Sequence, residues 1–258
     1  EAYINNVNKI KNGRRDSITD AVSHWSNYYN ENFERLAVIN FLPLVCPSVR
    51  DLIGATENYY GFTETDKKEF IFPLIQLLKS EFEFYEDYWN KLYDTTSTCR
   101  KAFELWIENE MSKYGALFSY FNKFAVVGMS YSMTNNGRGY GDSSSFNAVV
   151  PFAFDESQYK NISYQILHEY THQFTDELIG ESTRMDDGTH DISEKAVILF
   201  DYYLIKKLHK EDTDSYLKWI GSLANVDNCD ENLFLSVFKI NDDIKGKRLE
   251  LVEQIIRG

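Results

Sequence analysis

Residues 157–178 of the chain read SQYKNISYQILHEYTHQFTDEL, and the five residues HEYTH at 168–172 lie near the middle of this stretch. Apolar residues recur at helical spacing around them, as at Ile162, Ile166 and Phe174. This periodicity predicts one long helix that carries both histidines. The rest of the chain is best interpreted outward from this helix.

His168 and His172 are four residues apart, so on a helix they project from the same face, one turn from each other. Their imidazole nitrogens can therefore share one zinc ion. Glu169 follows the first histidine and can act as a general base toward a water molecule at the metal. The pattern indicates a zinc hydrolase. The alternative is a surface helix that happens to carry two histidines.

A catalytic zinc ion usually has three protein ligands. The extended pattern HExxHxxGxxH is absent, because Thr175 and Leu178 stand where it requires Gly and His. Glu194, near the start of the next expected helix, is the favoured third ligand. It could instead close a capping box with Asp191, three residues before it. His190 is the second candidate ligand, and its alternative interpretation is an exposed loop histidine.

Two further roles have candidates in the same region. A metal-bound histidine usually donates its other N–H to a carboxylate, and Asp201, two helical turns after Glu194, could accept it. Tyr202 and His190 could polarise a substrate carbonyl group. An aromatic residue in an apolar helix is, however, more often part of the core, which is the alternative for Tyr202.

The flanking sequence predicts an α+β fold, mostly helical with a small antiparallel sheet. Residues 1–120 form a helical N-terminal lobe, and residues 121–258 form the region that contains the two histidines. In the second region, 124–133 and 145–154 have strand composition, and the Gly- and Asn-rich segment 135–144 is expected to be a loop.

Pro151 cannot donate a hydrogen bond within a sheet, so the second strand should lie at the sheet edge or end there. The glycines of the preceding segment, Gly137, Gly139 and Gly141, could make it a mobile flap. The alternative is an ordinary flexible hairpin loop.

The segment HEYTH at 168–172, with Glu194 on the following helix, resembles the gluzincin group of zinc metallopeptidases. The resemblance implies a zincin-like fold in which an edge strand holds an extended peptide by backbone hydrogen bonds. Here that strand would be 145–154, with Asn147, Ala148 and Val149 as substrate-binding residues. In layout alone, the whole chain also resembles an uncharacterised family of Bacteroidetes proteins.

This chain departs from the gluzincin pattern at one position. Gluzincins often carry an acidic residue four positions after the ligand glutamate, and this chain has Ile198 there. The resemblance names no substrate beyond a peptide or protein.

Composition excludes some partners. The 258 residues include 27 Lys and Arg against 40 Asp and Glu, a formal net charge of −13. Nucleic acid and anionic membrane surfaces both require a basic face, so neither is expected as the main partner. The longest apolar stretch, 36–46, is shorter than the roughly 20 residues that span a bilayer, so we expect no membrane-spanning segment.

The compartment is inferred from weaker signals. The chain begins at Glu1 rather than Met, and with the family likeness this makes us expect an extracytoplasmic protein, secreted, periplasmic or lipid-anchored, whose leader has been removed. Cys46, Cys99 and Cys229 are scattered and odd in number, so they predict neither a paired metal site nor a dense disulfide framework.

Three functions remain open on the sequence alone. The favoured one is a zinc-dependent peptidase, with His168, His172 and Glu194 as metal ligands and Glu169 as general base. The second is a non-catalytic binding or scaffold protein built on the same fold. The third is a zinc hydrolase of a non-peptide amide.

Overall fold

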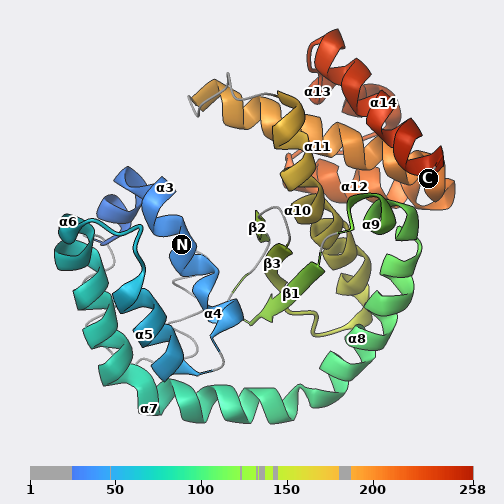
Figure 1. Ribbon diagram of the computed structural model, residues 1–258. Helices are drawn as coiled ribbons and strands as arrows, with labels where there is room; N and C mark the ends of the chain where they lie inside the picture. The colour runs from blue at the N-terminus through green and yellow to red at the C-terminus, as the bar shows by residue number, and fades with distance from the viewer. Residues whose placement is uncertain are drawn as a thin grey trace. The chain divides into compact units, whose positions relative to one another are not determined.

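The structure is a computed structural model that describes residues 25–46, 48–122, 124–131, 133, 137–141, 145–179 and 187–257 (Figure 1). The chain divides into two compact units. Unit 1 consists of Glu1–Thr98 and Ser130–Thr134, and unit 2 consists of Cys99–Met129 and Asn135–Gly258. The division falls at residue 98 rather than at residue 120, where the sequence analysis put it.

The earlier boundary has a physical cause in helix α8 (Ser97–Ser112). Its Phe103 packs edge-on against Tyr159 with ring centroids 5.0 Å apart. Further along α8, the buried Glu110 forms an ion pair with Lys160. These contacts bind α8 to the helix that carries HEYTH, so the helical segment after residue 98 belongs to unit 2.

Unit 1 is helical in its described part. Residues 25–31 are helical and are followed by α3 (Phe33–Leu36), η1 (Ala37–Asn40), α4 (Leu42–Val45), α5 (Val49–Asn58), α6 (Glu64–Asp66), the π-helical turn η2 (Lys67–Ile71) and α7 (Phe72–Thr95). Helix α6 begins after Thr63, which forms a reciprocal capping box with Asp66. The core of unit 1 contains Leu36, Phe62, Phe70, Ile71 and Ile75.

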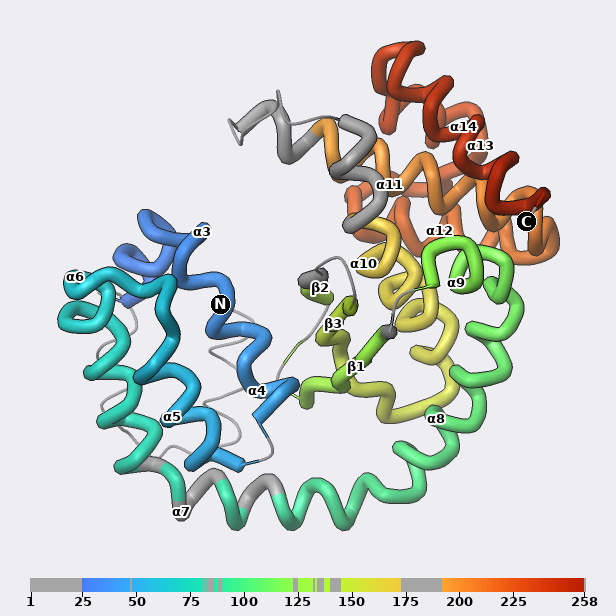
Figure 2. Tube along the Cα trace, in the orientation of Figure 1, coloured from blue at the N-terminus to red at the C-terminus, as the bar shows by residue number. Residues whose placement is uncertain are grey.

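Unit 2 contains the remaining helices. After α8 they are α9 (Gly115–Phe121), η3 (Glu156–Gln158), α10 (Tyr159–Ile179), α11 (Asp187–Leu208), η4 (Lys210–Asp212), α12 (Thr213–Leu223), α13 (Glu231–Val237) and α14 (Asp242–Arg257). Helices α9 and α14 lie side by side, although they come from opposite ends of the unit, and Tyr120 donates a hydrogen bond to Gln254 between them (Figure 2). The predicted helix around HEYTH is confirmed as α10.

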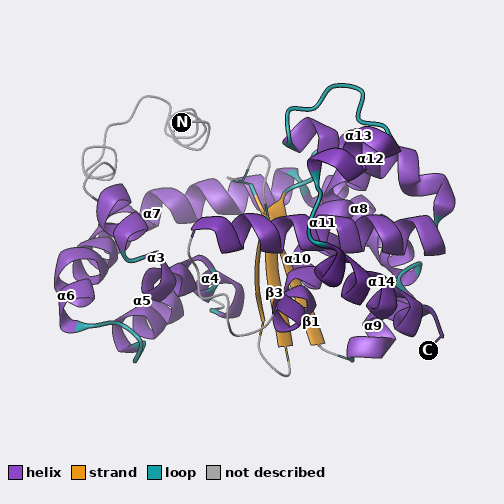
Figure 3. Ribbon diagram, turned by 90° about the horizontal axis from the view of Figure 1, so that it is seen from above, coloured by secondary structure: helices purple, strands orange, loops and turns teal. Residues whose placement is uncertain are grey.

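The sheet of unit 2 has the strands β1 (Phe124–Ser130), β2 (Arg138–Gly141) and β3 (Ser145–Pro151), in the order β1-β3-β2 (Figure 3). It is mixed rather than antiparallel: β2 and β3 are antiparallel, so β1 runs parallel to β3. The expected loop 135–144 therefore contains a strand at 138–141, which was missed because its glycines have low strand propensity.

The expectation that 145–154 is an edge strand is wrong, because β3 is the central strand. Pro151 is accommodated because β3 ends there, which was the other possibility considered. The backbone of Asn147, Ala148 and Val149 pairs with Tyr140, Gly139 and Arg138 of β2, in that order. These residues therefore lack the free edge on which their predicted role in substrate binding depended. Within the described residues, β2 rather than β3 has the free edge on this side of the sheet.

Strand β3 also ties the sheet to α10. Its residues alternate between half-buried and buried positions, and the buried set is Phe146, Ala148 and Val150. Phe146 packs edge-on against Tyr170 of α10 with ring centroids 5.3 Å apart. This period-two burial fixes the face of the sheet that α10 covers.

Among the described residues, no helix combines the length and apolar character needed to cross a membrane.

Candidate metal centre

Helix α10 presents the two histidines together. Their side chains are 12% and 22% exposed, for His168 and His172 respectively. Their rings meet edge to face with centroids 4.7 Å apart. The adjacent residues Ile166 and Leu167 are buried in the core, which fixes the rotation of the helix about its axis. Both imidazoles consequently lie on one side of α10, as their spacing predicts.

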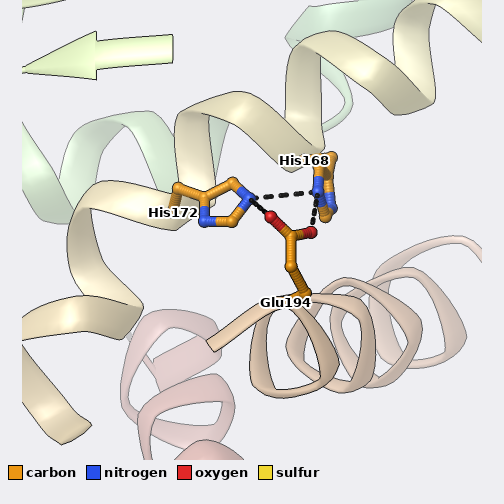
Figure 4. A group of neighbouring side chains, drawn as sticks. All are labelled: His168, His172 and Glu194. Carbon is orange, nitrogen blue, oxygen red and sulfur yellow. Dashed lines mark hydrogen bonds and ion pairs between the residues drawn. The ribbon is translucent and has the colours of Figure 1, made fainter. Parts of the chain in front are cut away.

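Glu194 reaches this pair from α11, as Figure 4 shows. Its Oε2 lies 3.3 Å from His168 Nε2 and its Oε1 lies 3.4 Å from His172 Nε2. Helix α11 begins at Asp187, earlier than the expected start at Asp191. Position 191 therefore lies within the helix, and the capping-box alternative for Glu194 no longer applies. His168, His172 and Glu194 form a group that could hold a metal ion.

The donor atoms lie close enough together to share one metal ion. Bonds of about 2.05 Å at tetrahedral angles put neighbouring ligand atoms about 3.3 Å apart. Besides the two separations from Glu194, the Nε2 atoms of His168 and His172 are 3.1 Å apart. The separations are of this size, and the two from Glu194 belong to its two different oxygens. Two imidazoles and one carboxylate are also a common protein ligand set for catalytic zinc.

A buried carboxylate stands behind the first histidine. Asp201 Oδ2 lies 3.2 Å from His168 Nδ1, and Asp201 Oδ1 accepts a hydrogen bond of 2.7 Å from Thr171 Oγ1. A hydrogen bond from Nδ1 to Asp201 leaves the lone pair of His168 Nε2 directed at Glu194 and the second imidazole. The structure thus brings Asp201 to the position that the sequence analysis considered for it, and Ile198, at 7% exposed, is a core residue.

The electrostatics of the site call for a positive charge among the donors. Burial disfavours the imidazolium form of His168, but its hydrogen bonds to Asp201 and Glu194 outweigh burial and raise its pKa to about 10. Burial likewise opposes ionisation of Glu194, yet the two histidines hold its pKa well below the usual range. A metal cation at this place would supply that positive charge, and it would compete with protons because metal ligands must be deprotonated.

Glu169, like Asp201, is an acidic residue near the donor group that is not part of it. Glu169 is half-buried, and burial raises the pKa of its carboxyl group although both histidines oppose the shift. Its carboxylate faces strand β2, because a Cβ atom added at Gly137 would lie 2.9 Å from Glu169 Oε1. A carboxylate with a raised pKa beside a metal site has the properties of a general base.

Of the other predicted site residues, Tyr202 does not join this group. Tyr202 has no exposed surface, packs against Phe234, and accepts a hydrogen bond of 3.1 Å from Lys206 Nζ. These contacts favour the core interpretation. The side chain of His190 lies outside the described part of the structure, so its candidate roles remain predictions. The sequence did not lead us to predict strand β2. The alternate spacing of its glycines, which matches the period of a strand, was the signal that could have indicated it.

Comparison of the chain with protein-family models, with curated protein sequences and with solved structures yields no match. The gluzincin resemblance therefore depends on HEYTH and Glu194 alone.

Proposed function

We propose that this protein is a zinc-dependent peptidase in which His168, His172 and Glu194 hold the metal ion and Glu169 is the general base. One observation carries the proposal. Two imidazoles and one carboxylate from two helices converge with separations of 3.1 to 3.4 Å between their nitrogen and oxygen atoms, and the carboxylate of Glu169 beside them is not part of the group. A purely structural zinc site would have no need of that additional carboxylate.

A bound zinc ion would supply Lewis acidity, which activates water and polarises a carbonyl group. Glu169 would take a proton from the attacking water as its oxygen adds to the peptide carbonyl carbon. The same carboxyl group would return that proton to the amide nitrogen as the C–N bond breaks. Asp201 would hold the His168 ring by accepting from Nδ1, which keeps Nε2 free for the metal.

The substrate would be a peptide in extended form. Strand β2 is an edge strand within the described residues and lies against α10, next to Glu169. An extended peptide can add to such an edge through backbone hydrogen bonds. This assigns to β2 the role that the sequence analysis gave to 145–154.

The test combines metal content with cleavage. Elemental mass spectrometry should find one zinc ion per chain in the wild type and much less in Glu194→Ala. Glu169→Gln should keep its zinc and lose at least about 100-fold in kcat on a peptide library. Glu250→Ala, at an exposed position of α14, is the control and should behave as wild type.

Each other outcome contradicts a specific part of the proposal. A wild type that binds no zinc after reconstitution at neutral pH would contradict the metal site. Full zinc with cleavage equal to wild type in Glu169→Gln would contradict the general base. Full zinc with cleavage of small amides but not of peptides would favour a non-peptide amide hydrolase. Zinc binding without any cleavage would favour a scaffold function.

A further inference from the structure

Two glycines at alternate positions, one just before strand β2 and one within it, meet the same side chain of α10. Gly137 precedes the strand and Gly139 lies within it. Successive residues of a strand point to opposite faces, so positions 137 and 139 share one face. The residue they share as a neighbour is Glu169. The arrangement presses the backbone of β2 against the carboxylate that the proposed function uses as base.

At position 137 the close approach involves the end of the Glu169 side chain. A Cβ atom there would lie 2.9 Å from Glu169 Oε1 and 3.0 Å from Glu169 Cγ, with Gln165 Cγ at 3.1 Å. These separations are shorter than normal carbon contacts, so some atom must move. The nearest atoms belong to side chains, so the Glu169 carboxylate would have to leave its present position and lose its present contacts.

At position 139 the neighbours are less able to move. A Cβ atom there would lie 3.0 Å from Phe146 Cε2, 3.1 Å from the backbone oxygen of Glu169, and 3.1 Å from Glu169 Oε2. The aromatic ring is buried in the core and the carbonyl belongs to α10. An added methyl group would therefore push strand and helix apart as well as contact the carboxylate.

We propose that Gly137 and Gly139 are positioning residues for Glu169: by lacking side chains, they let the backbone of β2 confine the carboxylate to one place beside the metal site. The inference depends on the proposed function only for what the carboxylate does there. It explains why a sheet strand contains residues of poor strand propensity, since any larger residue would occupy the space of the base.

The first experiment measures the contact without any assay of activity. Gly137→Ala should lower Tm in the wild-type background and lower it much less in a Glu169→Ala background, because the contacting atoms are then gone. Gly246→Ala is the matched control, since a Cβ atom there meets nothing within 4 Å. Its effect on Tm should be the same in both backgrounds. Equal losses for Gly137→Ala in both backgrounds would overturn the inference.

The second experiment measures position through kinetics. Gly137→Ala should keep full zinc content and its KM but lose about 10-fold or more in kcat, because a base displaced by a fraction of an ångström is poorly aligned. Gly139→Ala should lose kcat and also stability, since backbone and ring must move. If Gly137→Ala cleaves like wild type, these glycines do not position Glu169.

The two experiments separate this inference from the proposed function. A Tm loss that depends on Glu169, in a wild type that cleaves no peptide, would support the contact and contradict the peptidase. Cleavage by the wild type together with unchanged kcat in Gly137→Ala would support the peptidase and overturn the positioning role.

Discussion

Among the described residues, each unit has one aspartate without any exposed surface: Asp66 in unit 1 and Asp201 in unit 2. Asp66 accepts hydrogen bonds from Nε and Nη2 of Arg35, at 3.0 and 3.1 Å, and from Tyr28 and Thr63. Asp201 accepts instead from a hydroxyl group and faces an imidazole. Equal burial is thus combined with different partners.

The partners decide the charge of each carboxyl group. The Arg35 guanidinium holds the pKa of Asp66 well below its usual range, although burial opposes this. Burial raises the pKa of Asp201, although its hydrogen bonds to His168 and Thr171 oppose it. A permanent cation makes a buried carboxylate a structural anchor. One nitrogen of His168 contacts Asp201 and the other faces the remaining donors. The buried carboxylate of Asp201 is thereby connected to the candidate metal centre.

The largest effect is expected on the stability of unit 1 when Asp66 is replaced. Asp66→Ala removes the capping box at Thr63 and the hydrogen bonds from Tyr28 and Arg35. We expect the free energy of unfolding of unit 1 to fall by about 3 kcal/mol, because these donors lose a fully buried acceptor. Hydrogen-exchange mass spectrometry of peptides from the two units would measure this loss separately in each unit.

The control for this variant is Glu57→Ala, which removes an exposed ion pair of 3.6 Å with Lys79 and should change little. Zinc content should be unchanged in both variants. Loss of zinc from Asp66→Ala would show that unit 1 contributes to the metal site, and the comparison between the two aspartates would fail.

A smaller effect is expected when the connection in unit 2 is weakened. Asp201→Asn keeps the size of the side chain but removes the charge behind His168. Zinc affinity should fall 10- to 100-fold, about 1.4 to 2.7 kcal/mol, because the carboxylate orients the ring and raises its basicity. Competition with a chelator dye measures this directly. Asp214→Asn, at an exposed position of α12, should leave the affinity unchanged, and equal affinity in Asp201→Asn would remove Asp201 from the site.

The parts of the site that follow from local geometry could be predicted from the sequence. His168 and His172 are brought together by helical spacing alone, so their proximity needed no knowledge of the fold. Glu194 depends on the path between two helices, and its helix begins earlier than predicted. Asp201 lies two turns after Glu194 on the same helix, but only the packing of α11 against α10 puts it against His168.

The sheet could not be predicted in the same way. Local propensity favours 145–154 as a strand and disfavours 138–141, yet both are strands and the first is central. The position of β2 is set by pairing with β3 and by contact with α10, neither of which is local. Its glycines reduce strand propensity and permit the approach to Glu169, so the feature that hid the strand is also the one that explains it.

The smallest effect is expected for Arg35→Lys, which keeps the positive charge beside Asp66 and changes only the geometry of the cation. The Arg35 side chain is 45% exposed and contacts both oxygens of Asp66, whereas the single ammonium group of a lysine can contact them only one at a time. Arg35→Lys should therefore destabilise unit 1 less than Asp66→Ala does. It should also let the pKa of Asp66 rise toward its ordinary value.

The pH dependence of this variant follows from the sign of that shift. The pKa of Asp66 is lower in the folded than in the unfolded protein, so its stabilisation is complete above the unfolded pKa of about 3.9 and is lost as pH falls through the folded value. With a higher folded pKa, Arg35→Lys should lose protection of unit 1 at a higher pH during acid titration. An unchanged acid transition would mean that the other hydrogen bonds to Asp66, not the guanidinium fork, keep it ionised. In that case burial with any good donor would suffice for an anchor, and the difference from Asp201 would lie solely in the second nitrogen of His168.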